Sequence, residues 1–349
     1  MRRPTMLPAI TALAVLGLPA EAEGDRDHNP ANTISVEVGH PDSFRHFAPE
    51  LPAMRARVPE INTDLGLHVG EIEPGLFFVT DMIYQSAFLV TGAGVVVFDA
   101  PPSFGDRLLA AIDLAAPGVP ITHYILSHTH VDHNGGGVHL QGIDDLAIIA
   151  AEANAGSLAA APLPGVPAPT ETFAESLSLT VGGIPIELRT ARFHSTDADV
   201  VIHLPEQRFL MAVDTITPGE APFMNFGATS DLDGYMAGFD AFLAYEFDHF
   251  LSGHVSILGT REDVEIARDY AFDVRDTVGA LWPGFMGRFM ANIDLTEFRN
   301  GNLAYRMTIE QVRDDCAEQI IGRWQDRLSV VDLWADSHCE TVVLHAIMH

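Results

Sequence analysis

The sequence predicts a layered α/β domain followed by a helical C-terminal region. Over roughly residues 70–258, short β-rich runs bounded by turn residues alternate with segments of helical apolar spacing, a pattern typical of sheets covered by helices. Beyond residue 259 the apolar spacing is mainly helical. The chain has 349 residues, of which 47% are hydrophobic, so it is long and apolar enough to bury a sizeable core.

The first predicted strands form a β-meander. The runs FFVTDM, SAFLVTG and GVVVFDA are rich in β-branched and aromatic residues, and the turn residues 92–94 between the last two predict a hairpin. Residues 104–116 have helical apolar spacing that ends at Pro117 and Gly118. The run THYIL then predicts a strand that leads into a histidine-rich loop.

The second half of the domain continues this alternation. Between residues 147 and 213 a small helix alternates with predicted strands, which are LAIIA, LSLTV, IPIELRTA, DVVIHLP and RFLMAVD. Residues 231–247 predict a helix, and DHFLSGH predicts a strand. Thr260 and Asp263 have the spacing of a capping box, which predicts that a helix begins there and continues toward Leu281. A last long helix is predicted from about residue 303 to residue 328.

We expect four segments along the chain: a signal peptide at 1–22, an irregular arm at 23–66, the α/β domain at 67–258 and the helical region at 259–349. Arg2 and Arg3 precede a largely apolar stretch and a small-x-small cleavage pattern, as in export signals. A frayed apolar terminus is the alternative interpretation. Because no stretch reaches about 18 unbroken apolar residues, we expect a periplasmic or secreted protein without a membrane span.

Charge and composition exclude several classes of function. The chain has 48 acidic and 19 basic residues and a formal net charge of -29, so its surface would repel nucleic acid phosphates. All of the basic residues are arginine, whereas P-loop nucleotide binding and Schiff-base catalysis both need a lysine amine. We therefore expect a small-molecule substrate and no nucleic-acid partner.

The strongest chemical signal is the run HTHVDH. Its ligand-type side chains lie within six residues and are His128, His130, Asp132 and His133. Imidazole and carboxylate are groups that zinc binds, and a short loop after a strand can turn such side chains toward two neighbouring points. A solvated histidine-rich loop is the alternative interpretation.

The HTHVDH run resembles the signature of the metallo-β-lactamase superfamily at every defining position. The other motifs of that family occur in order, with Asp99 in GVVVFDA, His194 in ARFHSTDAD, Asp214 in FLMAVDT and His254 in FLSGHVS. The resemblance covers about residues 70–258. It implies an αββα metallo-β-lactamase sandwich, here with a helical C-terminal extension, and a site in a cleft at the edge of the two sheets.

The resemblance also implies two Zn²⁺ ions per chain, held by a ligand set of the glyoxalase II type. The implied ligands of one ion are His128, His130 and His194. Those of the other ion are Asp132, His133 and His254. Asp214 would bridge the two ions, and because β-lactamases of the superfamily typically lack this aspartate, it favours the glyoxalase II-like, lactonase-like and general hydrolase branches. Asp99 would lie beside the site and support the ligand loop.

These expectations point to a secreted zinc-dependent hydrolase. Two zinc ions would share a water, lower its pKa to about 7 and present hydroxide to an ester, lactone, thioester or lactam carbonyl. Asp132 would orient the nucleophile or take its proton. Phe223, Met224 and Phe226 would form an apolar wall of the substrate cleft, with ordinary core packing as the alternative.

Two other functions fit the same sequence features. A persulfide dioxygenase-like enzyme would keep nearly all of these ligands while using a single iron. A non-catalytic metal-binding accessory protein of the periplasm would keep the fold without turnover. Metal analysis and turnover measurements separate these functions from the hydrolase.

The two cysteines also leave two alternatives open. Cys316 lies in a predicted helix, and Cys339 lies 23 residues further along the chain. In an oxidising compartment they can pair and join the last segment to that helix, or they can remain as two buried thiols.

Overall fold

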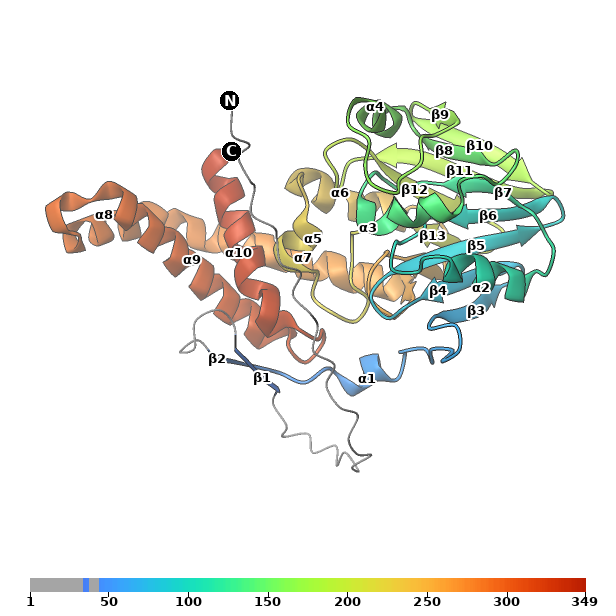
Figure 1. Cartoon of the computed structure of the whole chain (residues 1–349). Coiled ribbons are helices and arrows are strands. Elements are labelled where there is room, and N and C mark those ends of the chain that lie inside the picture. The colour runs from blue at the N-terminus through green and yellow to red at the C-terminus, as the bar shows by residue number, and fades with distance from the viewer. Residues whose placement is uncertain (1–33, 38–43) are drawn as a thin grey trace, which may run out of the picture.

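The computed structural model describes residues 34–37 and 44–349, so the expected signal peptide at residues 1–22 lies outside the described residues. Two stacked β-sheets form the centre of the domain, and helices cover both outer faces (Figure 1). This arrangement confirms the predicted αββα sandwich. Ahead of it, the described residues form the paired strands β1 (Ile34–Glu37) and β2 (Phe44–Phe47) and the short helix α1 (Pro52–Arg55).

The first sheet contains the predicted β-meander. Along the described chain its strands lie in the order β3 (His68–Glu73), β4 (Leu76–Thr80), β5 (Gln85–Thr91), β6 (Gly94–Phe98), β7 (Ile121–Ile125), β8 (Ala147–Ala151) and β9 (Glu171–Phe173). Strands β3 to β6 are antiparallel, and β6 to β9 are parallel. Strand β6 is buried along its whole length, which explains its unbroken apolar sequence, because other layers cover both faces of the sheet. The predicted hairpin is confirmed, since Thr91 pairs with Gly94 across the turn.

The second sheet places two strand ends next to each other. In the described residues its order is β10 (Ser176–Val181), β11 (Ile184–Ala191), β12 (Asp199–Leu204), β13 (Phe209–Met211), β14 (His249–Leu251) and β15 (Gly259–Thr260). Neighbouring strands are antiparallel except for β13 and β14, which are parallel. The carboxyl ends of β13 and β14 therefore meet at one edge of the sheet.

Within the described part of the chain, three apolar clusters hold the layers together. The central cluster lies between the two sheets and includes Phe98 of β6 and Met211 of β13. A second cluster packs α2 (Arg107–Ala115) and α4 (Glu152–Ala160) against the first sheet. The third cluster packs α6 (Leu232–Leu243) and the C-terminal helices against the second sheet. Burial of these apolar surfaces is the main force that holds the sandwich together.

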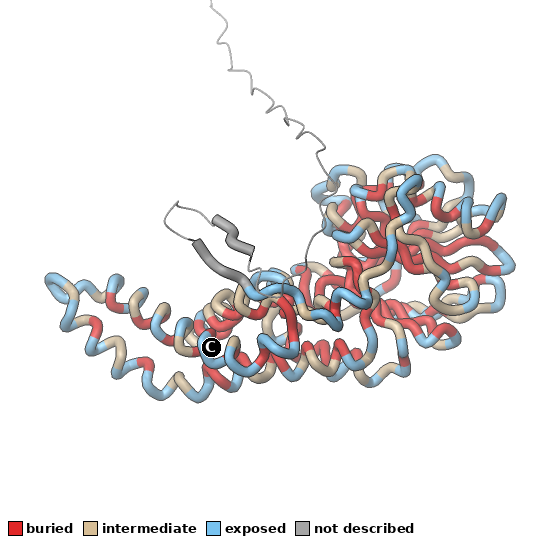
Figure 2. Tube along the Cα trace, turned by 90° about the horizontal axis from the view of Figure 1, so that it is seen from below, coloured by how far each residue is buried: buried red, intermediate tan, exposed pale blue. Residues whose placement is uncertain are grey.

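The C-terminal region is packed firmly onto this sandwich. Its helices within the described residues are α7 (Arg261–Leu281), η2 (Trp282–Gly284), α8 (Phe285–Leu295), η3 (Glu297–Arg299), α9 (Gly301–Trp324) and α10 (Val331–Met348). Helix α7 begins with the predicted capping box of Thr260 and Asp263. Buried residues continue from the sandwich into α7, α9 and α10, whereas the far end of the α8–α9 pair is mostly exposed (Figure 2). No helix in the described ranges is both long enough and apolar enough to cross a membrane.

Of the two alternatives for the cysteines, the structure contains the disulfide. Cys316 on α9 is bonded to Cys339 on α10, and both residues are fully buried. By restricting the unfolded chain, a disulfide that closes a loop of this length contributes about 3 kcal/mol to the free energy of unfolding. We expect urea unfolding of the reduced protein to show a loss of this size relative to the oxidised protein. The Cys316→Ala/Cys339→Ala variant is the control, since a reductant should not change its midpoint.

Candidate metal centre

The HTHVDH run connects strand β7 with helix α3 (Val131–Asn134). His128 follows the end of the strand, and His130 has extended backbone at the N-cap of α3. The single turn of α3 then carries Asp132 and His133. A strand end and one helical turn thus present several ligand-type side chains from a single short segment.

The remaining ligand candidates each follow a strand of the second sheet. His194 lies beyond β11, Asp214 beyond β13 and His254 beyond β14. Among the described residues, the candidate ligand atoms fall into two groups, in each of which all atoms lie within 4.8 Å of one another. The groups are His128, His130, His194 and Asp214, and Asp132, His133 and His254. The fold therefore brings together every residue that the sequence motifs single out as a ligand.

Asp214 belongs to the first group and also faces the second, with one carboxylate oxygen toward the imidazoles of each. Its Oδ2 atom is 3.3 Å from Nε2 of His128 and 3.2 Å from Nε2 of His194. Its Oδ1 atom is 3.1 Å from Nε2 of His133 and 3.0 Å from Nε2 of His254. A carboxylate placed in this way can bridge two cations, each of which also has imidazole ligands.

Burial and close packing shift the pKa values of several of these groups. Burial and the imidazoles of His128 and His194 lower the pKa of His130 to about 4. Burial also acts to lower the pKa of His133, but nearby carboxylates, chiefly that of Asp214, raise it to about 9. Burial acts to raise the pKa of Asp214, yet the surrounding imidazoles hold it well below its ordinary value. Asp214 therefore stays ionised at neutral pH, as a bridging carboxylate must.

A chain of hydrogen bonds fixes the orientation of His128. The carboxylate of Asp99 accepts hydrogen bonds from the backbone N–H of Ser127 at 2.8 Å and from its hydroxyl at 2.6 Å. Because that hydroxyl donates to Asp99, its oxygen accepts from Nδ1–H of His128, at 2.9 Å. The Nε2 atom of His128 is then a lone-pair donor that faces the cluster. Oδ2 of Asp214, at 3.3 Å, has lone pairs and no hydrogen to donate, so Nε2 is buried without a hydrogen-bond partner among the described residues. A metal ion would satisfy this environment, so the residues present fit a metal centre.

Asp199 organises the segment that carries His194. Its carboxylate accepts hydrogen bonds from the backbone N–H groups of Phe193 and His194, both at 2.8 Å, and from the hydroxyl of Ser195 at 2.7 Å. Ser127 and Asp199 are absent from the sequence-based predictions. Their positions carry a signal nevertheless, because Ser127 directly precedes the HTHVDH run and Asp199 is the last carboxylate of HSTDAD.

The backbone is strained beside the candidate ligands. Asp99, Asp214 and Val255 have left-handed φ angles of 57°, 64° and 60°, which cost energy in residues other than glycine and cluster at functional sites. Gly253 has a φ of 89°, and a Cβ atom there would lie 2.9 Å from the ring of His133. A glycine is required at this position because the neighbouring ligand segments approach so closely.

The open side of the centre has an apolar rim. Asp132 and His254 reach this side, with 43% and 37% of their side chains exposed. The loop between β4 and β5 lies against it, since Tyr84 forms a backbone bridge with His254 and packs its ring 4.9 Å from the imidazole. Met82 and Ile83 of the same loop are exposed. The sequence-based predictions name none of these three residues as part of the site, and they place Met82 in the strand FFVTDM, whereas β4 ends at Thr80.

The three residues of the predicted apolar wall differ in their exposure to solvent. Phe226 is fully buried in the third apolar cluster, where its ring stacks on His338 at 4.4 Å. It is therefore packed in the core and has no surface to offer a substrate. Phe223 and Met224 are 53% and 40% exposed and remain candidates for substrate contact.

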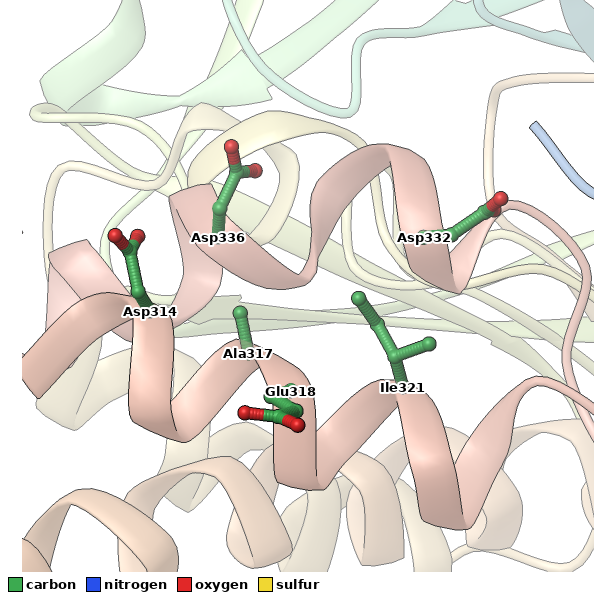
Figure 3. Close-up of a pocket in the computed structure, with 6 residues that line it drawn as sticks. All are labelled: Asp314, Ala317, Glu318, Ile321, Asp332 and Asp336. Carbon is green, nitrogen blue, oxygen red and sulfur yellow. The ribbon is translucent and has the colours of Figure 1, made fainter. Parts of the chain in front are cut away.

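A groove in the C-terminal region contains none of the candidate ligands. It lies between α9 and α10, as Figure 3 shows, and is lined by Asp314, Ala317, Glu318, Ile321, Asp332 and Asp336. Its carboxylates belong to the helical region and take no part in the metal centre described above.

The comparison with protein families identifies one match. A family model described as the metallo-beta-lactamase superfamily matches residues 80–270, which is more than half of the chain. The matched range contains Asp99 and every candidate ligand. A comparison with curated protein sequences finds no match.

The comparison with solved structures finds matches at low sequence identity. A stereoselective inverting sec-alkylsulfatase from Pseudomonas sp. has a TM-score of 0.57 and 14% identity, and the match covers 80% of this chain and 50% of the sulfatase. A metallo-beta-lactamase from Pontibacter korlensis has a TM-score of 0.49 and 21% identity, and the match covers 58% of this chain and 97% of that chain. The match with the sulfatase thus involves about half of that protein's length, and the likeness to it concerns the fold alone.

Proposed function

The chain belongs to the metallo-β-lactamase superfamily, and on this premise we propose that it is a hydrolase that uses two zinc ions. The observation that carries the proposal is the position of Asp214, whose two oxygens face two separate groups of imidazoles at 3.0–3.3 Å. A site for a single metal does not need a carboxylate shared in this way. The superfamily is generally hydrolytic, which supports the reaction class.

We assign the two ions to the two groups of side chains. His128, His130 and His194 would hold one ion, and Asp132, His133 and His254 the other, with Asp214 shared. When bound, the ions would lower the pKa of a water and polarise the bond under attack. Asp99, through Ser127, keeps Nε2 of His128 free for this role.

Asp132 is the proposed proton acceptor. Its Oδ2 atom lies 3.6 Å from Nε2 of His133 and 3.8 Å from Nε2 of His254. Its side chain is 43% exposed, so it can reach a water and a substrate on the open side of the centre. From there it can orient the attacking water and accept its proton, because a general base must lie within hydrogen-bond reach of that proton.

The rim of the centre favours a substrate with an apolar part. Met82 and Ile83 lie on one loop beside His254, and Phe223 and Met224 follow Asp214 along the chain. The net charge of -29 opposes the approach of highly anionic substrates. We therefore propose a neutral or weakly charged ester, lactone, thioester or lactam as the substrate.

A substrate panel tests this function. We would assay p-nitrophenyl acetate, p-nitrophenyl decanoate, a γ-lactone, a thioester, a cephalosporin and a secondary alkyl sulfate, before and after chelation and with added zinc. We expect turnover of at least one carbonyl substrate, its loss on chelation and its return with zinc. Failure of zinc-loaded protein on every carbonyl substrate would contradict the proposal. Oxygen consumption by an iron-loaded form would support the dioxygenase instead.

We further propose that the protein is exported to the periplasm or secreted. The disulfide between Cys316 and Cys339 supports this, because disulfides persist mainly in oxidising compartments. Mass spectrometry of protein recovered from the producing cells should find a mature chain that begins at Glu23. Recovery of an uncleaved chain from the cytoplasm would contradict export.

A further inference from the structure

We propose that the C-terminal helix α10 positions the substrate wall of the active site, with Ser337, His338 and Thr341 as positioning residues. They hold the loop of residues 223–228, called the wall loop below, which carries the exposed Phe223 and Met224. This inference rests on the proposed hydrolase function. It assigns the helical extension a role in substrate selection, beyond stability.

The wall loop needs external support because its backbone is strained. It contains α5 (Met224–Ala228), in which consecutive residues are left-handed, with φ angles of 55° at Asn225, 57° at Phe226, 73° at Gly227 and 57° at Ala228. Residues with a Cβ atom pay an energetic cost in this conformation, which is rare in successive positions. Such a segment persists only where its surroundings determine its conformation.

Helix α10 supplies these surroundings. The backbone N–H of Asn225 donates to the hydroxyl of Ser337 at 3.1 Å. The hydroxyl of Thr341 lies 3.2 Å from Oδ1 of Asn225 and 2.8 Å from the carbonyl oxygen of Ser337, so these two acceptors share its one hydrogen. These bonds hold the middle of the strained turn by both its main chain and its side chain. Aromatic contacts add to them, since Phe223 packs against Trp334 with 5.1 Å between ring centroids.

His338 links the wall loop to the interior of the helical region. Burial lowers the pKa of His338 to about 4, so the ring is neutral at pH 7 and carries one proton. The carbonyl oxygen of Phe223 can only accept, so Nε2–H of His338 donates to it, at 3.3 Å. Nδ1 then accepts from the hydroxyl of Tyr270 on α7, at 2.7 Å. The neighbouring Cys339 is bonded to α9, so α10 itself is fixed in place.

The same loop is in direct contact with the metal-ligand segments. A Cβ atom on Gly227 would lie 2.7 Å from the carbonyl oxygen of Asp214. Just past the loop, Ser230 donates hydrogen bonds from its backbone N–H and its hydroxyl to the carbonyl oxygen of His194, at 2.9 Å and 2.8 Å. The loop therefore spans from α10 to two ligand segments, and Phe223 and Met224 are its exposed apolar side chains.

Removal of the hydrogen bonds between α10 and Asn225 should impair the hydrolysis of a long-chain ester more than that of a short one. The Ser337→Ala/Thr341→Val variant deletes both hydrogen bonds to Asn225 with little change in volume. We expect amide hydrogen exchange of residues 223–230 to become about tenfold faster. We also expect kcat/KM for p-nitrophenyl decanoate to fall about tenfold, mainly through KM, whereas that for p-nitrophenyl acetate stays within about twofold. The metal content should not change.

A matched control and a rescue sharpen the test. Thr308→Val removes a buried hydroxyl between α8 and α9 that does not contact the wall loop, so it should leave both the exchange of residues 223–230 and the decanoate KM unchanged. At position 338, glutamine can still donate to the carbonyl of Phe223, whereas phenylalanine cannot. Amide hydrogen exchange of residues 223–230 should therefore be slower in His338→Gln than in His338→Phe.

Two results would overturn the inference. One is unchanged hydrogen exchange of the loop in the Ser337→Ala/Thr341→Val variant, and the other is an equal loss of kcat for both esters. If the zinc-loaded wild-type protein hydrolyses no carbonyl substrate of the panel, the proposed function fails. The hydrogen-exchange comparison still decides whether α10 holds the wall loop.

Discussion

Replacement of Asp214 by asparagine is expected to lower turnover by a factor of about 100 or more. The asparagine amide keeps the size of the side chain but has one oxygen and no negative charge. It therefore cannot face both groups of imidazoles with an oxygen, as the carboxylate does at 3.0–3.3 Å. Steady-state kinetics on the best substrate of the panel, together with metal analysis, measure the effect.

The loss should come from the site and not from unfolding. Asp214 follows the end of β13 and does not belong to any of the three apolar clusters, so circular dichroism should show an intact fold. Asp273→Asn is the control, since it removes a carboxylate that pairs with Arg323 in the helical region. Near-wild-type turnover by Asp214→Asn with two bound zinc ions would rule out the bridge and favour a β-lactamase-like site without it.

Replacement of His128 by alanine is expected to remove the ion of the first group and nearly all activity. Mutation of a residue that only orients a metal ligand typically lowers metal affinity or activity by about 10–100-fold. His128 is itself a proposed ligand, so the loss of activity should exceed about 100-fold. His128 is buried and donates to Ser127 through Nδ1, so alanine removes an imidazole whose free Nε2 is already oriented toward the cluster. Metal analysis of the purified variant and its kcat/KM check this result.

His123→Ala is the matched control for this variant. His123 lies on β7, just ahead of the HTHVDH run, and its ring contacts the hydroxyl of Thr122. It belongs to neither group of candidate ligands, so its replacement should leave metal content and turnover close to those of the wild type. Equal losses in the two variants would mean that His128 acts through the structure of the strand.

The sandwich and the candidate ligands could be predicted from the sequence because their signals are local. The HTHVDH run gathers four ligand-type side chains in one segment, and His194, Asp214 and His254 each follow a recognisable strand. Strand ends meet at the edges of sheets, so these positions converge whatever the details of packing.

Other features depend on contacts between distant parts of the chain. The sequence predicts Phe226 as a residue of the substrate cleft, but its ring is buried against His338 of α10. The hydrogen bond next to it joins Asn225 to Ser337, which is 112 residues away. The role of Ser127 likewise depends on Asp99, 28 residues earlier. No local pattern contains such pairings, because tertiary packing decides which polar groups meet.

The central claim is that the chain binds one metal ion in each group, with Asp214 between them. Elemental analysis of protein purified without a chelator tests it most directly, with His254→Ala as the comparison. We predict close to two zinc ions per wild-type chain and one per His254→Ala chain, because His254 belongs to the second group alone. A single metal ion per wild-type chain, unchanged in His254→Ala, would contradict the account.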